Sequence, residues 1–364
     1  MQIVPSLPEL VEQNNHQSQR RPILTHLNAD TSWLISFPRP ASSQSKASHD
    51  HQEVRKHRAY YHVLIDPWLS STGVAFYRWF LTLTHKITCA FETIEDVRGL
   101  VRQIENAASK RNSQSTPADG EDVGEVDAVF IGHYAPDHCN RETLLQLGKN
   151  VPVISAHSGV STIKAWKHFN DDRVLGMQSL EIENVQRLWV DNMDDDIKRI
   201  MPSWLRVGHI PCKTTLPGIH WAMVIAWSPD HKPLCHGSDT PVETIFYTPH
   251  GVFADRLHTN PTWTDPTQNG STMLAVLHGL SPALSPQPAN LGVQNGWEIV
   301  RKIKPRYWIP THDEELSFTG LLSWFQSRLP GKFEDIVRVD GDDDEKTSKV
   351  VMKELGNGES FILM

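Results

Sequence analysis

The 364-residue chain lacks long apolar runs, a signal peptide and an excess of positive charge. No apolar run approaches the roughly 18–20 residues that a membrane-spanning helix needs, and the polar segment Met1–Arg21 has no apolar core for secretion. The net charge of −8 argues against broad nucleic-acid binding, which requires Lys and Arg to neutralise phosphates. These absences favour a soluble, cytoplasmic protein with neither nucleic acid nor a membrane as partner.

Cysteine is scarce, and no two cysteines form a CxxC pair among Cys89, Cys139, Cys212 and Cys235. A chain of this length with so few cysteines does not read as a disulfide-stapled secreted domain. No Gly-x-Ser-x-Gly elbow supports a serine nucleophile, and Cys139 is expected to be a packed thiol. Phosphate-binding glycine loops are absent as well. Nucleophilic and nucleotide-dependent enzymes are therefore disfavoured.

What the chain does contain is a succession of short apolar segments interleaved with helical patterns. The helical spacing of Ile94, Val97, Leu100, Val101 and Ile104 predicts a helix over 94–108. Further helices are expected at 141–147, 161–168 and, as the last core helix, 320–327, while 74–87 reads as a helix or an ordered flap. Strands are expected at 23–27, 32–37, 60–65, 126–131, 151–154, 205–210, 220–227, 244–247, 274–277, 299–303 and 307–309.

This alternation favours layers of sheet covered by helices. We expect one folded domain over 22–335. A flexible tail is expected over 1–21 and an acidic segment over 336–364, where Asp340–Glu345 forms a charged run. The polar stretches 39–56 and 109–125 read as surface loops.

Histidine is the informative excess, at 19 residues. The strongest local signal is the sequence GHYAPDH over 132–138, directly after a buried strand, because a metal needs imidazoles and carboxylates converging from rigid positions. Taken alone, the motif fits equally well if Asp137 or His138 caps the next helix. Two further strands end in a histidine, His250 in YTPHG and His312 in YWIPTHDE, and helix capping does not explain three such ends. The sequence therefore predicts a metal site.

With these motifs the chain resembles the metallo-β-lactamase superfamily over roughly residues 22–325. Ile65-Asp66-Pro67-Trp68 resembles a strand end of the L-ascorbate-6-phosphate lactonase-like branch. The HxxxDH, YTPHG and LHGL segments look similar to poorly characterised fungal members. The resemblance implies an α+β fold, a four-layer αββα metallo-β-lactamase sandwich, with metals held at one end between two sheets.

By position in the family's motifs, the resemblance implies metal ligands at His133, Asp137, His138, His250 and His312. Asp137 is also implied as the catalytic residue, which helps to orient an attacking water. The sequence alone does not give the positions of these side chains relative to one another, so their convergence on one site is an expectation.

The motif departs from the family's usual HxHxDH at two points. Ala135 replaces the middle histidine, and His250 stands where the family has a bridging aspartate. A separate middle ligand has no clean match, the weak candidates being His157, His209 and His220. Losing these groups leaves the first metal position poorly held, and a neutral imidazole does not bridge two metals, so a mononuclear site is expected.

Three histidines and one aspartate suit one zinc ion, with manganese or iron(II) as alternatives. Hydrolysis needs an open coordination position, whereas four protein ligands tend to close a tetrahedral shell, as in structural zinc sites. Either His250 is not a ligand, or the site expands to five ligands, or the site is not catalytic. The sequence leaves these alternatives open.

Four further residues are expected around the site. Asp66 is implied by the resemblance as a carboxylate near the metal. Asp313 either orients the imidazole of His312 or places charge at a helix N-terminus. His157 and His278 each follow an apolar strand and are candidates to line the pocket.

The function implied is a metal-dependent hydrolase of a small ester, lactone, thioester or phosphate ester, acting through a metal-bound water on a small-molecule substrate. The alternative is a non-catalytic protein of the same fold whose degenerate metal site serves structure or ligand binding. A nuclease of the same fold fits the acidic balance least. Oligomeric state is not predicted.

Overall fold

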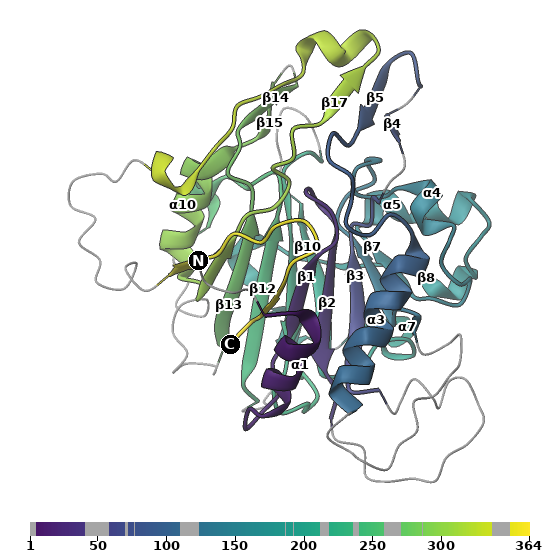
Figure 1. The fold of residues 1–364 in the computed structure, drawn as a ribbon, viewed down its shortest axis with the longest axis vertical. Coiled ribbons are helices and arrows are strands. Elements are labelled where there is room, and N and C mark those ends of the chain that lie inside the picture. The colour runs from purple at the N-terminus through teal and green to yellow at the C-terminus, as the bar shows by residue number, and fades with distance from the viewer. Residues whose placement is uncertain are drawn as a thin grey trace.

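Two large β-sheets packed face to face make up the body of the protein in the computed structural model (Figure 1). The structure describes residues 5–40, 58–69, 72–75, 77–109, 124–185, 187–191, 193–211, 218–235, 240–257, 271–285, 287–336 and 350–364. Most of the predicted loops 39–56 and 109–125, and the acidic run Asp340–Glu345, lie outside the described residues. No helix in the described part is long and apolar enough to cross a membrane.

The first sheet has seven strands in the order β20-β1-β2-β3-β6-β7-β8. Strands β1, β2 and β3 are antiparallel neighbours, whereas β3, β6, β7 and β8 run parallel. The strand bounds are β1 Ile23–His26, β2 Trp33–Pro38, β3 Tyr60–Ile65, β6 Ala128–Ile131, β7 Val153–Ser155, β8 Val174–Gly176 and β20 Ser360–Ile362.

The second sheet also has seven strands, in the order β19-β16-β13-β12-β11-β10-β9. Here β12, β13 and β16 run parallel, and β10, β11 and β12 are antiparallel neighbours. The strand bounds are β9 Gln178–Ser179, β10 Leu205–Pro211, β11 Trp221–Trp227, β12 Val242–Thr248, β13 Ser271–His278, β16 Tyr307–Ile309 and β19 Val351–Met352.

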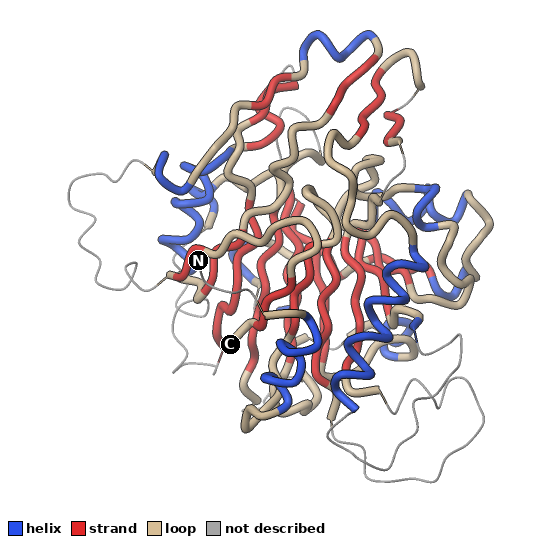
Figure 2. The backbone as a smooth tube through the Cα atoms, viewed as in Figure 1, coloured by secondary structure: helices blue, strands red, loops and turns tan. Residues whose placement is uncertain are grey.

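Helices cover the outer faces of both sheets, so the strands lie in the middle (Figure 2). The helix bounds are α1 Leu7–Asn15, α3 Ile94–Ser109, α4 Arg141–Leu144, α5 His157–Ala165, α6 Arg187–Val190, α7 Asp195–Lys198 and α10 Gly292–Ile303. Short 3-10 helices are η2 Asp171–Arg173, η3 Ile182–Asn184, η4 Ala254–Arg256, η5 Leu321–Phe325 and η6 Phe333–Asp335. Two three-stranded sheets stand at one end of the molecule: β4 Gly73–Ala75, β5 Leu81–Thr84 and β17 Ser317–Thr319, and β14 Ala283–Ser285, β15 Gln287–Asn290 and β18 Ser327–Arg328.

The alternation of side chains along β3 shows how the layers form. Tyr61, Val63 and Ile65 belong to the core between the two sheets, whereas Tyr60 and Leu64 belong to the core under helices α1 and α3. Successive side chains of a strand point to opposite faces, so a strand that is apolar at every position is buried on both. The four-layer αββα sandwich that the sequence predicted is confirmed.

Two predicted elements are wrong. Residues 299–303 are the last turns of helix α10 and not a strand, because Val293, Trp297 and Val300 continue a helical spacing that a five-residue window hides. The expected core helix over 320–327 is the short 3-10 helix η5, in which Trp324 is 91% exposed. The segment predicted as a helix or an ordered flap over 74–87 contains strands β4 and β5, which form a small sheet with β17.

Both chain ends differ from the expected tails. Helix α1 begins with a capping box between Ser6 and Glu9, and its Leu10 and Val11 are buried in the core shared with α3. Residues 350–364 supply an edge strand to each sheet, β19 beside β16 and β20 beside β1.

A buried ion network ties strands β2, β3 and β6 together beside helix α3. The carboxylate of Asp127 accepts hydrogen bonds from Arg39 (2.6 Å), from Arg58 and from the backbone N–H of His62 (2.8 Å). Burial by itself would raise the pKa of Asp127, but the guanidinium groups of Arg58 and Arg39 hold it below its ordinary value. A carboxylate with a depressed pKa stabilises the fold above its ordinary pKa, and this stabilisation is lost as the pH falls through the folded-state pKa.

We predict that Asp127→Asn lowers the free energy of unfolding by about 3 kcal/mol, because two buried guanidinium groups lose their counter-charge. The difference from wild type should shrink as the pH falls below the ordinary carboxyl pKa of about 4, because the unfolded wild-type chain then binds a proton at Asp127 that the folded protein does not bind until the pH reaches its lower folded-state pKa. Urea unfolding at pH 7 and about pH 2.5 measures both effects. Asp195→Asn, which removes an exposed ion pair with Lys198, is the control and should leave the unfolding midpoint unchanged. An equal loss at both pH values would contradict the charge argument.

Candidate metal centre

The candidate site lies where strand ends from both sheets meet. Asp66 follows β3, the motif 132–138 follows β6, His250 follows β12 and His312 follows β16. Strands β3 and β6 are parallel, as are β12, β13 and β16. Carboxyl ends of parallel strands share one edge of a sheet, where open α/β folds bind ligands.

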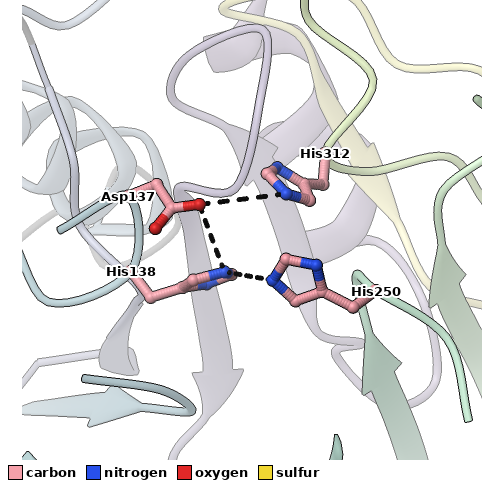
Figure 3. Close-up of side chains that lie close together, drawn as sticks. All are labelled: Asp137, His138, His250 and His312. Atoms are coloured by element: carbon pink, nitrogen blue, oxygen red, sulfur yellow. Dashed lines mark hydrogen bonds and ion pairs between the residues drawn. The ribbon is translucent and has the colours of Figure 1, made fainter. Parts of the chain in front are cut away.

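Four side chains converge at this edge: Asp137, His138, His250 and His312 (Figure 3). One potential ligand atom from each lies within 4.8 Å of the others. The Nε2 atoms of His138 and His250 are 2.9 Å apart, and Asp137 Oδ2 lies 3.7 Å from His138 Nε2 and 3.9 Å from His312 Nε2. Asp137, His138, His250 and His312, predicted from three separate strand ends, are thus brought together.

Each histidine directs its other ring nitrogen outward to an acceptor. His138 Nδ1 donates to Asp66 (2.7 Å), and His312 Nδ1 lies 2.9 Å from both carboxylate oxygens of Asp30. His250 Nδ1 lies 3.1 Å from the Ala289 carbonyl oxygen. A metal-binding imidazole is typically oriented in this way, which leaves the Nε2 lone pair free for the ion.

The Asn290 amide, 2.8 Å from His250 Nδ1, has two arrangements. With its oxygen toward Nδ1 it accepts a hydrogen bond, and His250 Nε2 then offers a lone pair. Turned over, its nitrogen donates to Nδ1 and to the Ala289 carbonyl, and its oxygen accepts from Arg328 (3.2 Å). The second arrangement puts a proton on His250 Nε2, which faces His138 Nε2. A protonated His138 and a bound metal ion both require the first arrangement, in which His250 Nε2 carries no proton.

The pKa values of two of the imidazoles, His138 and His250, are shifted in opposite directions. Burial lowers the pKa of His138, but the carboxylates of Asp137 and Asp66 outweigh it and raise the value to about 9. Burial, together with the neighbouring His312 and His138, lowers the pKa of His250 well below its ordinary value. Without a metal, one proton therefore lies between His138 Nε2 and His250 Nε2, which face each other. A divalent cation fits the same position, and the donor set of three imidazoles and one carboxylate suits zinc.

Two residues of the site adopt a backbone conformation that side chains rarely take. Asp66 has φ 41° and His312 has φ 60°, both in the left-handed region that is uncommon for residues other than glycine. Such strain persists only where the surrounding structure determines it, and it clusters at functional sites. The strained residues here are one ligand candidate and the carboxylate that orients another.

His133 lies beside the cluster and not in it. Its ring centroid is 5.9 Å from that of His138 and 6.4 Å from that of His250. The indole of Trp221 stacks parallel to it at 6.4 Å and also contacts His138 edge-on at 5.5 Å. An added Cβ at Gly132 would come within 2.1 Å of this indole, so glycine is needed there. Trp221 occupies the space on this side of the cluster.

The remaining predicted residues lie further out. Asp66 contacts His138 as described, whereas the carboxylate of Asp313 accepts from the backbone N–H groups of Leu280 and Ser281 (2.7–3.0 Å). Both ring nitrogens of His278 are engaged, with the Gly279 carbonyl and with Asn295. The other three histidines lie outside the cluster. His157 lines a pocket with Met177 and Arg206, and His209 stacks on Trp221. The two ring nitrogens of His220 lie within hydrogen-bond distance of the carbonyl oxygens of Gly251 and Pro288.

Three important residues were not anticipated: Asp30, Tyr247 and Asn290. Asp30 lies in the turn between β1 and β2 and is fully buried. Burial would raise its pKa, but His312 and Arg328 hold it well below the ordinary value. Tyr247 donates its hydroxyl to Asp66 (2.9 Å). The only sequence signal was that Asp30 and Asn290 are polar residues flanking apolar strands.

No family model and no curated protein matches the chain. Among solved structures, a possible metal-dependent hydrolase from Veillonella parvula DSM 2008 is similar, with 11% identity and a TM-score of 0.47 over 94% of this chain and 100% of that one. A metallo hydrolase from the archaeon Ignicoccus hospitalis KIN4/I has 11% identity and a TM-score of 0.41 over 93% and 97%. An isothiocyanate hydrolase from Delia radicum gut bacteria has 11% identity and a TM-score of 0.44 over 94% and 99%. At this level the likeness carries no conclusion about substrate or mechanism.

We predict that Asp30→Asn weakens zinc binding about 10- to 100-fold, because the amide no longer fixes and polarises the imidazole of His312. Competition with a chromogenic chelator measures the zinc dissociation constant. Asp313→Asn is the control: this neighbouring, partly buried carboxylate accepts hydrogen bonds from the backbone N–H groups of Leu280 and Ser281, with no imidazole among its hydrogen-bond partners in the described residues. Equal effects of the two substitutions would contradict the assigned orientation of His312.

Zinc binding should release a proton at neutral pH. Because the pKa of His138 is raised to about 9, this imidazole is protonated at pH 7 and must lose its proton to coordinate a metal. The zinc affinity should therefore fall about tenfold for each pH unit below 9. Titration calorimetry in two buffers of different ionisation enthalpy counts the released protons. No proton release at pH 7 would show that His138 is not a ligand.

Proposed function

We propose that this protein is a metal-dependent hydrolase that holds one zinc ion through Asp137, His138, His250 and His312. Its proposed substrate is a small ester, lactone, thioester or phosphate ester. The observation that carries the proposal is the convergence of three buried Nε2 atoms, each on a ring whose Nδ1 faces a carboxylate or carbonyl oxygen. Three imidazoles that only packed against one another would not each need a hydrogen-bond acceptor at Nδ1.

Zinc in such a site supplies Lewis-acid chemistry and lowers the pKa of water to about 7, so that hydroxide is available at neutral pH. The protein's own residues would hold the side chains that bind the zinc ion in place. His138 and His312 are held by hydrogen bonds to Asp66 and Asp30. The carboxylate of Asp137 is 11% exposed, and among the described residues its contacts are ion pairs of 3.7 Å and 3.9 Å with His138 and His312. Asp137 is therefore the ligand most able to move, to open a coordination position and to accept a hydrogen bond from the attacking water.

The second candidate function is a structural or ligand-binding metal site. The observation that favours it is the same four-residue set, because four buried protein ligands close a tetrahedral shell. A closed site exchanges no water, whereas a hydrolase must. The two functions therefore differ in whether zinc-loaded protein has a coordination position that an external ligand can enter.

Three narrower assignments are also proposed: the branch of the superfamily, the identity of the metal and the location in the cell. Membership of the L-ascorbate-6-phosphate lactonase-like branch is supported by the IDPW, HxxxDH and YTPHG segments, and zinc over manganese or iron by the three imidazoles. A cytoplasmic location is supported by the small number of cysteines, of which the three in the described residues are free thiols.

The test is metal content by mass spectrometry on protein purified without chelator, for wild type and for the double variant His138→Ala with His312→Ala. We expect about one zinc per wild-type chain, none in the double variant, and one in the control His16→Ala at an exposed position. The zinc-loaded wild type is then assayed on a panel of esters, lactones, thioesters and phosphate esters. Turnover that the double variant lacks supports the hydrolase. Stoichiometric zinc with no turnover supports the structural alternative, and no zinc in wild type overturns both.

A further inference from the structure

His133 is a buried imidazole with one nitrogen left unused. Its side chain is 7% exposed, and its Nε2 has no hydrogen-bond partner among the described residues. A buried polar atom without a partner costs about 1–3 kcal/mol, and such atoms at functional sites commonly await a ligand or a water. The question is which kind of ligand this nitrogen suits.

The local hydrogen bonds define the tautomer of His133. The backbone N–H of Ala135 lies 3.1 Å from Nδ1, and because a backbone N–H only donates, Nδ1 accepts. In the neutral ring Nε2 therefore carries the hydrogen and is a donor. A ring whose Nδ1 accepts a hydrogen bond carries only the one proton on Nε2 and is neutral. A ring of this tautomer offers a metal no lone pair at Nε2.

The ring is also held in place. It stacks parallel to Trp221 and contacts Tyr134, with ring centroids 6.4 Å and 4.4 Å apart. Its plane makes angles of 84° and 67° with the rings of His138 and His250 in T-shaped contacts. A fixed N–H donor that is next to a cation site but outside it matches the position of a group that binds the substrate and not the metal.

We propose that His133 is a substrate-binding residue whose Nε2–H donates to the carbonyl or phosphoryl oxygen of the substrate, and that it is not a metal ligand. The proposal rests on the hydrolase function proposed above. No proton is transferred by His133: the N–H remains on Nε2 and the hydrogen bond strengthens as negative charge develops on the substrate oxygen. Substrates without such an oxygen are excluded from the class.

The experiment compares zinc-loaded wild type, His133→Ala and His209→Ala, with inorganic phosphate as the probe in titration calorimetry. His209 is the matched control, because it also stacks on Trp221 and also has a buried Nε2 without a partner among the described residues, but it is not one of the residues of the cluster. We expect His133→Ala to bind phosphate about tenfold or more weakly, with one zinc per chain retained. His209→Ala should match wild type. His133→Gln, which restores an N–H donor, should recover part of the affinity and serves if the alanine variant does not fold.

The outcomes distinguish failure of the role proposed for His133 from failure of the hydrolase proposal. Loss of zinc in both His133 variants would make His133 a ligand and overturn the inference while the hydrolase proposal stands. Unchanged phosphate affinity, or equal losses in the His133 and His209 variants, would also overturn it. A nitrogen-15 spectrum of histidine-labelled wild type gives a further readout: a proton on Nδ1 of His133 contradicts the donor assignment. A wild type that holds no zinc overturns the hydrolase proposal and this inference with it.

Discussion

The carboxylate of Asp66 joins the two sheets at the edge where the candidate site lies. One oxygen accepts from the backbone N–H of Gly132 (2.7 Å) and the other from His138 Nδ1 (2.7 Å) and the Tyr247 hydroxyl (2.9 Å). Gly132 directly follows β6 of the first sheet, whereas Tyr247 is on β12 of the second. Because the carboxylate is fully buried, each of these bonds is strong and costly to break. The position of the first ligand histidine therefore depends on the packing of both sheets, and the left-handed backbone at Asp66 is kept in place by the same bonds.

Trp221 limits the number of side chains that can surround the candidate metal site. Its indole lies against the rings of His133, His138 and His250, and this close approach is possible because residue 132 has no side chain. An indole fills space without offering a lone pair, so the side of the cluster nearest His133 provides bulk and no additional ligand. This arrangement is consistent with the proposed single ion and with the proposed position of His133 outside the coordination shell.

The sequence anticipated the parts of the site that follow directly from strand ends. Asp137, His138, His250 and His312 each come within a few residues of an apolar strand, and the parallel order of those strands brings them to one edge. Asp30 was missed because it meets His312 across 282 residues of sequence, a pairing that only the packing of two sheets creates. The strand predicted at 299–303 was wrong for a related reason: a short apolar window does not distinguish a buried strand from the buried face of helix α10.

Charge balance gives a physical reason for a divalent ion at this edge. Three buried carboxylates surround the imidazoles, those of Asp30, Asp66 and Asp137, and the guanidinium of Arg328 lies 3.7 Å from Asp30. With His138 protonated, three negative charges face two positive ones. When a divalent cation replaces that proton, two charges on the ion and one on Arg328 offset the three carboxylates. Buried charge is tolerated only when it is paired, so the surrounding carboxylates favour a cation of charge two over a single proton.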